Sequence, residues 1–254
     1  MSETGRLRRG ARAATSSADS APWPAWSVTT APPDSWTLPN RASARGYPNT
    51  AAAPARPSGA ATVDIVGHSM GGQFGLYAAA DLGTRVRRLA VLGAPGAALR
   101  GVKPIPAMCL LALPKLGPMA LSRPMPDRMF ERTNDVSLGR DALRDAAPEM
   151  VVALRLIGAR TGNAPSIAGF FRALVKRASV RPQVMLAGDT LARLGQPVQF
   201  VWGDDDVFLR PLAAAASIVA VRDVRVLRLP GAGHAPWLQA PERTGRAVSG
   251  HLRG

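Results

Sequence analysis

The stretch from Val63 to Ala80 reads VDIVGHSMGGQFGLYAAA, a short apolar strand followed by a glycine-rich corner and a helix-like run. Ser69 stands at the corner, with Gly67 and Gly71 two positions to either side. A strand that turns this sharply into a helix forces its corner residue into a rarely populated backbone conformation. Side chains two positions away are expected to collide there, and glycine avoids the collision. The pattern therefore predicts a serine hydroxyl that stands clear of the backbone.

This G-x-S-x-G pattern is typical of a catalytic nucleophile at a strand-to-helix elbow. The next amide, on Met70, is expected to point the same way as the Ser69 hydroxyl from the helix N-terminus, where it can stabilise an oxyanion. The alternative interpretation is an ordinary glycine-rich turn, able to bind a phosphate. A nucleophilic serine needs a base, and the base needs an orienting acid.

The chain has three candidate bases, since it contains only three histidines. His234 lies in LRLPGAGHAPWLQAPE, where a predicted strand over Val224–Leu229 runs into a glycine-rich loop. A histidine on a loop after a sheet strand is well placed to reach a nucleophile. We expect His68 to project to another side of the corner and to pack there, and we expect His251 to be a solvated tail residue. For His234 the alternative is a loop histidine with no catalytic role.

The candidate acid comes from the stretch PVQFVWGDDDVFL. A strand is predicted over Pro197–Trp202, and three aspartates follow the turn at Gly203. A histidine partner would stabilise one of these carboxylates, whereas the alternative is a solvated acidic turn.

Three motifs together resemble the α/β-hydrolase superfamily: Gly67 to Gly72, Trp202 to Asp206, and Gly231 to Trp237. The chain order serine, aspartate, histidine is the order of that fold. The sequence is most similar to the small bacterial esterase, C–C hydrolase and peroxidase-like branch, over roughly Thr62 to Leu252. Serine at the elbow argues against haloalkane dehalogenases and epoxide hydrolases, which carry aspartate there.

The resemblance implies particular roles for the motif residues. In that family the acid usually stands three residues after the glycine of the W-G-x-x-D turn, which selects Asp206. The implied triad is then Ser69, Asp206 and His234, with the Met70 amide as an oxyanion donor. The implied reaction proceeds through an acyl-enzyme and requires neither a metal nor an organic cofactor, and no cysteine and histidine cluster has metal-ligand spacing.

The rest of the chain predicts an α/β domain with an insertion. We expect the core over residues 61–100 and 194–254, where predicted strands alternate with helices and therefore form a mostly parallel sheet. Residues 101–193 read as helices broken by prolines, and Pro148 and Pro165 lie near the starts of two of them. In the resembled family, an insertion at this place forms a helical cap over the active site.

The first part of the insertion, IPAMCLLALPKLGPMAL, is apolar on nearly every side. It is too short and too interrupted by proline to span a membrane, so we expect it to be buried or to line a pocket. Adaptable side chains could shape an apolar substrate pocket, or they could only pack the cap against the sheet. These are Met108, Leu111, Met119, Met125, Met129 and Phe130.

Residues 1–60 have a different composition from the rest. They contain eight prolines, and their only leucine, isoleucine or valine residues are Leu7, Val28 and Leu38. The composition predicts a low-complexity, disordered segment without strands. The family's early strands and the H-G-x-x loop that supplies a second oxyanion amide are not recognisable. We hypothesise a truncated gene or an upstream frame error, which would leave Thr62 to Val66 as an unprotected sheet edge.

Charge and cysteine content bear on partners and compartment. The formal charge is +15, with 29 arginines among 32 cations, but the arginines are scattered and form no basic helix with interleaved aromatics. We therefore expect a small-molecule substrate and no nucleic-acid partner, and the sequence gives no indication of the oligomeric state. Cys109 is the only cysteine, so no intramolecular disulfide forms, and a cytoplasmic location is expected.

Three functions remain at this stage. The first is a serine hydrolase acting on an ester, or a related acyl or C–C bond, of a small apolar substrate. The second is a degenerate member of the same fold that binds a small molecule with little turnover. The third, a binder of nucleic acid or anionic surfaces, is supported by net charge alone.

Overall fold

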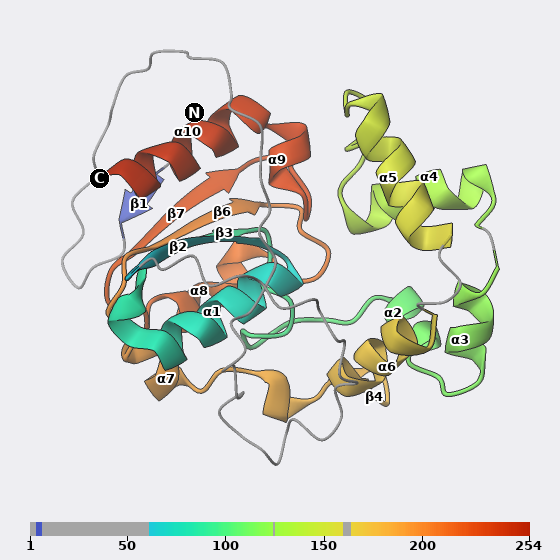
Figure 1. The fold of residues 1–254 in the computed structure, drawn as a ribbon, viewed down its shortest axis with the longest axis horizontal. Helices are drawn as coiled ribbons and strands as arrows, with labels where there is room; N and C mark the ends of the chain where they lie inside the picture. The colour runs from blue at the N-terminus through green and yellow to red at the C-terminus, as the bar shows by residue number, and fades with distance from the viewer. Residues whose placement is uncertain (1–3, 7–60, 124, 160–163) are drawn as a thin grey trace.

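The computed structural model describes residues 4–6, 61–123, 125–159 and 164–254 (Figure 1). Its main sheet has the strand order β1-β7-β6-β3-β2. The four longer strands run parallel to one another. They are β2 (Val63–His68), β3 (Val86–Leu92), β6 (Val198–Gly203) and β7 (Val224–Leu229). The predicted α/β architecture with a parallel sheet is therefore confirmed.

The short strand β1 (Thr4–Arg6) pairs antiparallel with β7, with Thr4 opposite Leu227 and Arg6 opposite Arg225. The prediction that residues 1–60 contain no strand is thus wrong for these three residues. Pairing at an open sheet edge uses main-chain groups, so it leaves little signal in the side chains. Residues 1–3 and 7–60, which carry the rest of that prediction, lie outside the described residues.

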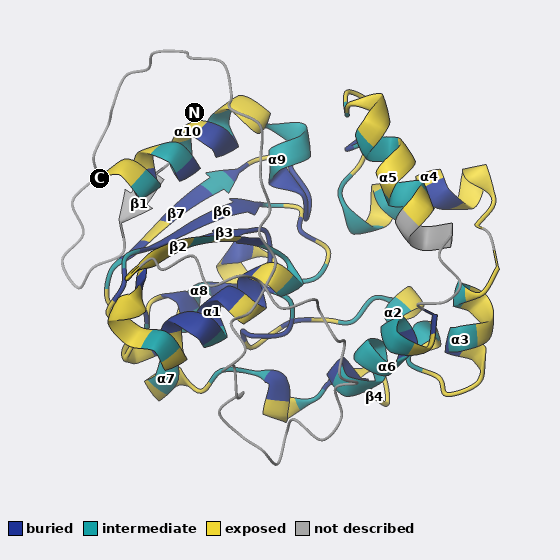
Figure 2. Ribbon diagram, viewed as in Figure 1, coloured by how far each residue is buried: buried dark blue, intermediate teal, exposed yellow. Residues whose placement is uncertain are grey.

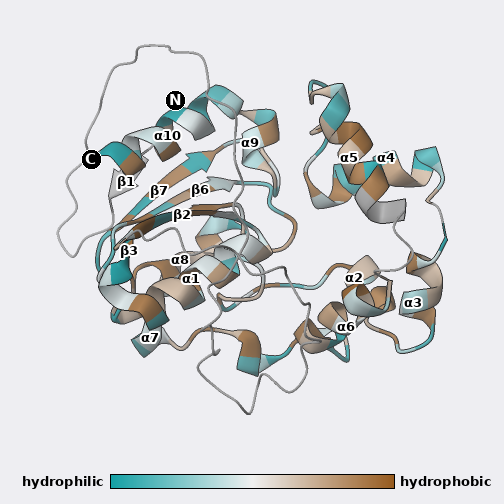
Figure 3. Cartoon of the chain, in the orientation of Figure 1, coloured by the Kyte–Doolittle hydropathy of each residue, from teal (hydrophilic) through white to brown (hydrophobic). Residues whose placement is uncertain are grey.

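Helices cover both faces of the parallel strands. The helices α1 (Met70–Leu82) and α8 (Pro211–Ile218) lie on one face, while α9 (Pro236–Gln239) and α10 (Pro241–Arg253) lie on the other (Figure 1). Side chains along β3 alternate between the two layers: Leu89 and Val91 join the α1 side, and Ala90 and Leu92 join the α10 side. The central strand β6 is buried throughout, which explains its apolar run (Figures 2 and 3).

The strand β2 forms the other edge of the sheet. Among the described residues no strand pairs with its outer side, and the side chains of Val63 and Val66 are 42% and 38% exposed. The predicted edge at Thr62 to Val66 is therefore present in the described part of the chain.

The insertion follows β3 and lies on the side toward which the parallel strands point (Figure 1). It has two groups of helices: α2 (Pro106–Leu111), α3 (Leu116–Leu121) and α6 (Ala164–Leu174) pack together, and α4 (Asp127–Ser137) is linked to α5 (Pro148–Ala159). The ion pair of Arg155 with Asp127 and the stacking of Arg155 over the Phe130 ring, 4.3 Å from its centroid, join α4 to α5.

The apolar start of the insertion is not buried, so of the two expectations for it only the lining of a pocket stays a prediction. No residue of α2 is buried and only Gly117 of α3 is, while Leu113 and Met119 are exposed. Each helix is six residues long and packs on its neighbours along one side, so its other apolar sides remain uncovered by described residues. Of the side chains expected to shape a pocket, Phe130 is buried and Met125 and Met129 are exposed.

The last part of the insertion returns to the core before residue 193. It contains the hairpin of β4 (Val175–Lys176) and β5 (Ser179–Val180), the short helix η4 (Pro182–Val184) and α7 (Gly188–Ala192). Leu174, Val184 and Leu191 belong to the same hydrophobic cluster as the sheet. Across the described ranges, no helix has the length and apolarity needed to cross a bilayer.

Candidate active site

Ser69 lies at the carboxyl end of β2 with φ 54° and ψ −120°, a backbone conformation that residues other than glycine rarely adopt. A Cβ at Gly67 would lie 2.4 Å from the carbonyl oxygen of Gly71, so the predicted collision is real there. The same prediction is wrong for Gly71, whose Cβ would meet no atom within 4 Å. The second tight position is Gly72 instead, where a Cβ would stand 2.8 Å from Val91 Cγ1.

The Ser69 and Met70 amides differ in their partners. The Ser69 amide donates to the carbonyl of Leu92 at 3.2 Å, which fixes the corner against β3. The Met70 amide, at the start of α1, donates to no group within the described part of the chain. This amide is therefore unpaired among the described residues, and its role as an oxyanion donor stays a prediction.

The side chains of Asp206 and His234 form a buried pair. The Nδ1 atom of His234 lies 2.9 Å from Oδ2 of Asp206, and the two residues are 5% and 1% exposed. The same Oδ2 accepts the Ala94 amide at 2.8 Å, and Oδ1 accepts the Phe208 amide at 3.0 Å. These amides hold the carboxylate in one orientation, so the histidine presents Nδ1 to the aspartate and keeps Nε2 free for another partner.

The loops that carry this pair are tied together by their backbones. The Asp204 amide donates to the Leu229 carbonyl at 3.1 Å, and the Asp205 amide donates to the Ala232 carbonyl at 3.0 Å. The three aspartates are thereby separated: Asp204 forms an ion pair with Arg228 at 2.8 Å, Asp205 is exposed, and Asp206 faces the histidine.

The structure brings Ser69, Asp206 and His234 to the carboxyl ends of three parallel strands, β2, β6 and β7, with β3 between β2 and β6. Within the described residues, the Ser69 hydroxyl makes no hydrogen bond to His234. The link between their segments runs through His68, whose Nε2–H donates to the His234 carbonyl at 2.9 Å and whose ring centroid lies 4.9 Å from that of His234. Catalytic hydrogen bonds are often long in the absence of substrate and shorten when it binds.

His68 packs as predicted, between the rings of His234 and Trp237, whose centroids lie 4.9 and 5.9 Å away. Burial, together with the nearby charge of His234, lowers the pKa of His68 to about 4. The neutral imidazole that results keeps a proton on Nε2 for the His234 carbonyl.

The expectation of a solvated His251 is wrong. This residue lies in α10, is 2% exposed, and packs toward the sheet. Its burial lowers its pKa, and the neighbouring charges of Arg88 and Arg225 act in the same direction. The expectation rested on its position near the end of the sequence, but the last helix, α10, covers a face of the sheet and therefore buries it.

Sequence reasoning missed two glutamines that organise the site. The buried Gln73 accepts the Ala97 amide at 2.9 Å and donates to the Val184 carbonyl at 3.2 Å, so it joins α1 to two loops. Gln239 bonds to Gly233, next to His234, and to Arg140 in the insertion. Their partners lie far away along the sequence, and no local pattern indicates them. No group of three potential metal-binding side chains occurs in the described ranges.

A parallel sheet whose carboxyl edge carries an elbow serine and a bonded histidine–aspartate pair is the arrangement of α/β hydrolases. Residues 6–247 match the sequence model of the alpha/beta hydrolase family, so the chain belongs to that family. No curated protein matches the chain.

Solved structures with the same fold include several hydrolases. The 2-hydroxy-6-oxo-6-phenylhexa-2,4-dienoate hydrolase BphD from Rhodococcus sp. strain RHA1 is 21% identical with a TM-score of 0.57, covering 76% of this chain and 65% of that one. A thermophilic esterase from Thermogutta terrifontis is 20% identical with a TM-score of 0.54 and the same coverages, 76% and 65%. The carboxylesterase CesB from Bacillus subtilis is 19% identical with a TM-score of 0.51, covering 76% and 61%.

These likenesses establish the fold. The chain aligns with somewhat less than two thirds of the length of each of these structures, between 61% and 65%.

Proposed function

We propose that this protein is a serine hydrolase that cleaves an ester, or a related acyl or C–C bond, of a small apolar substrate. The observation that carries the proposal is the buried His234–Asp206 pair, which lies at the carboxyl ends of the parallel strands, as does the strained corner of Ser69. A histidine held by a carboxylate at Nδ1 can act as a general base at Nε2, and the proton that such a base accepts is that of a serine hydroxyl at an elbow.

In the proposed first half-reaction, His234 Nε2 takes the Ser69 proton as the hydroxyl oxygen attacks the substrate carbonyl carbon. The Asp206 carboxylate stabilises the imidazolium that forms. The developing oxyanion accepts the free Met70 amide, supported by the N-terminus of α1. His234 then returns the proton to the leaving group, and the acyl-enzyme remains.

In the second half-reaction, water gives a proton to His234 as its oxygen attacks the acyl carbon. His234 then returns that proton to the Ser69 oxygen as the bond from this oxygen to the acyl carbon breaks, which releases the acid and restores the free enzyme. Every step in this scheme uses side chains and amides of the chain itself. The apolar, methionine-rich insertion on the same side as the strand ends supports an apolar substrate, since methionine adapts to varied apolar shapes.

A second candidate is a family member that binds a small molecule with little turnover. Two observations favour it: the described part of the chain makes no hydrogen bond from the Ser69 hydroxyl to His234, and among the described residues only Met70 is placed as an oxyanion donor. Loss of one oxyanion donor costs on the order of a hundredfold in rate or more.

Labelling with a fluorophosphonate, combined with turnover of p-nitrophenyl esters of increasing acyl length, tests the proposal. Ser69→Ala should remove both labelling and turnover while the protein stays folded. Ser217→Ala, a half-buried serine on α8, is the matched control and should leave both unchanged. Labelling that persists in Ser69→Ala contradicts the proposal, and labelling without turnover supports the second candidate.

A further inference from the structure

The loop that carries His234 is bonded to the insertion as well as to the sheet. The Ala235 amide donates to the Leu138 carbonyl, just after α4, at 2.8 Å. A Cβ at Gly233 would lie 2.5 Å from the Gly139 Cα, so the two backbones touch. Glycine at both positions permits this approach, and Gly139 has φ 127°, a conformation that disfavours other residues. The chain thus forms a close backbone contact between segments about one hundred residues apart.

Gln239 joins the two sides of this contact with a single side chain. Its Oε1 accepts the Gly233 amide at 2.7 Å, and its Nε2 donates to the Arg140 carbonyl at 2.9 Å. A Cβ at Gly139 would lie only 2.3 Å from Oε1 of Gln239, so the side chain is fitted against that glycine. The amide group uses its acceptor for the loop of His234 and one of its donors for the insertion.

We propose that Gln239 is a positioning residue that makes the placement of His234 depend on the insertion; this inference rests on the proposed hydrolase function. The main chain of His234 is held at three successive places. The Gly233 amide is held by Gln239, the His234 carbonyl by His68, and the Ala235 amide by Leu138. Two of these three bonds depend on the segment that follows α4: Leu138 accepts the Ala235 amide directly, and Gln239 is itself bonded to Arg140.

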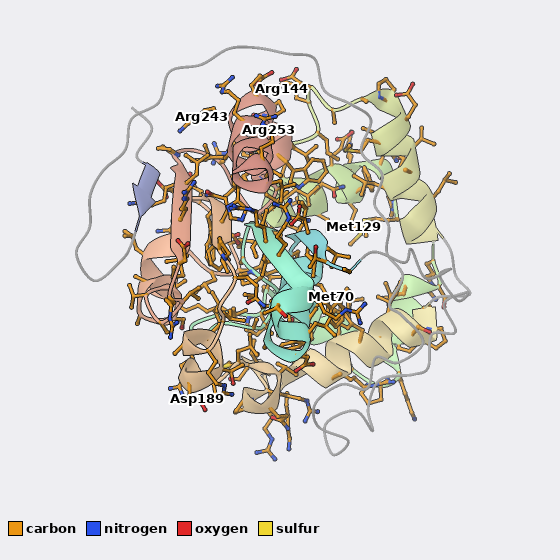
Figure 4. All side chains as sticks on the ribbon, turned by 60° about the vertical axis from the view of Figure 1, so that its left-hand side comes forward. Met70, Met129, Arg144, Asp189, Arg243 and Arg253 are labelled. Carbon is orange, nitrogen blue, oxygen red and sulfur yellow. The ribbon has the colours of Figure 1, made fainter. Side chains whose placement is uncertain are left out.

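The contact of residues 233–235 with residues 138–140, bridged by Gln239, is called the joint below, and it has solvent on one side. A cavity of about 290 Å³ opens beside it, lined among others by Arg140, Leu238 and Gln239. Arg144 and Arg243, the second of which lies on α10, border the same cavity (Figure 4). Because water can compete for bonds at the edge of such a cavity, the joint can loosen without global unfolding. A substrate that moves α4 would then shift His234 relative to Ser69, although Gln239 need not touch the substrate.

Two substitutions separate the arms of the joint. Gln239→Leu has a similar size and removes both hydrogen bonds. Gln239→Glu keeps an acceptor for the Gly233 amide but places a carboxylate oxygen against the Arg140 carbonyl, so only the arm to the insertion is lost. Gln183→Leu is the matched control, since Gln183 is exposed on η4 and forms no hydrogen bond in the described residues.

The experiment measures kcat and KM for a p-nitrophenyl ester together with amide hydrogen exchange at Gly233 and Ala235. For Gln239→Leu we expect kcat to fall about tenfold with KM nearly unchanged, and exchange at both amides to accelerate about tenfold or more, as expected for the loss of one or two hydrogen bonds. Gln239→Glu should speed exchange at Ala235 while protecting Gly233. Gln183→Leu should behave as wild type.

Unchanged exchange at both amides, or a rise in KM with kcat intact, would overturn the inference. If Gln239→Leu does not fold, Gln239→Glu still decides through the contrast between the two amides. If the wild type hydrolyses no ester and takes no fluorophosphonate, the hydrolase proposal fails. The exchange contrast, and the NMR signal of the His234 Nδ1 proton bonded to Asp206, then still decide whether Gln239 positions the loop.

Discussion

The backbone conformation of Ser69 leads to a prediction about stability. A residue other than glycine at φ 54° and ψ −120° stores roughly 1–3 kcal/mol of strain. Ser69→Gly removes the Cβ that causes the strain, whereas Ser69→Ala keeps it. Within the described residues the Ser69 hydroxyl makes no hydrogen bond, so neither variant loses one. The difference between the two variants therefore isolates the strain.

The expected size follows from two opposing terms. Glycine costs about 0.4–1 kcal/mol relative to alanine through the entropy of the unfolded chain. Subtracting this from the released strain leaves Ser69→Gly more stable than Ser69→Ala by about 1 kcal/mol. Urea unfolding followed by tryptophan fluorescence measures the difference at equal m-values.

Ala80 provides the control, because it lies exposed on α1 in ordinary helical geometry. There, replacing alanine by glycine should cost about 1 kcal/mol, so the sign of the effect reverses between the two sites. If glycine at position 69 lowers stability as it does at position 80, the corner is unstrained and the steric account of the elbow is refuted.

Three further outcomes are expected. Asp206→Asn should lower kcat by about 10³–10⁴-fold, because an amide favours the wrong histidine tautomer, whereas the exposed Asp205→Asn should change it by less than about twofold; the reverse order in ester assays would place the acid one residue earlier. Gly67→Ala should cost about 3 kcal/mol or more in urea unfolding through its clash with backbone, while Gly71→Ala, with open space around its Cβ, should gain about 0.5–1 kcal/mol, and equal effects would contradict the corner geometry. The pKa of His68 is about 4 in the folded protein and 6.5 at its ordinary value, so on acidification the unfolded chain protonates His68 before the folded protein does. The free energy of unfolding is therefore highest above pH 6.5 and should fall by about 2 kcal/mol by pH 5. His68→Gln should lose correspondingly less stability between pH 7.5 and 5.

The sequence predicted the buried centre of the fold well. The strand predicted over Val224–Leu229 has the same bounds in the structure, where its valines and leucines are buried. Asp206 was chosen over two adjacent aspartates by its distance from Gly203, and it is the one that meets His234 in the structure.

The features that sequence could not supply depend on pairing across long separations. Nothing near Leu138 or Gln239 in the sequence indicates their partners, because Leu138 bonds to the Ala235 main chain and Gln239 bonds to the Arg140 main chain, which every residue type shares. The same holds for the strand at Thr4–Arg6. The exposure of Leu113 could not be read from the sequence for a different reason: apolar composition indicates what a helix would prefer to cover, and not whether a neighbour is present to cover it.

The hydrogen bond from Ala235 to the Leu138 carbonyl limits how this protein can be re-engineered. Suppose that the insertion is cut near residues 101 and 193 and replaced by that of a relative. The exchange would bring in new side chains near the site, but it would also remove the Leu138 carbonyl that accepts the Ala235 amide next to His234. A graft that keeps Leu138, Gly139 and Arg140 from this chain preserves that partner. The insertion and the core are therefore not interchangeable modules, because the insertion must keep its backbone path over residues 138–140 and the glycine at 139 even where it never meets a substrate.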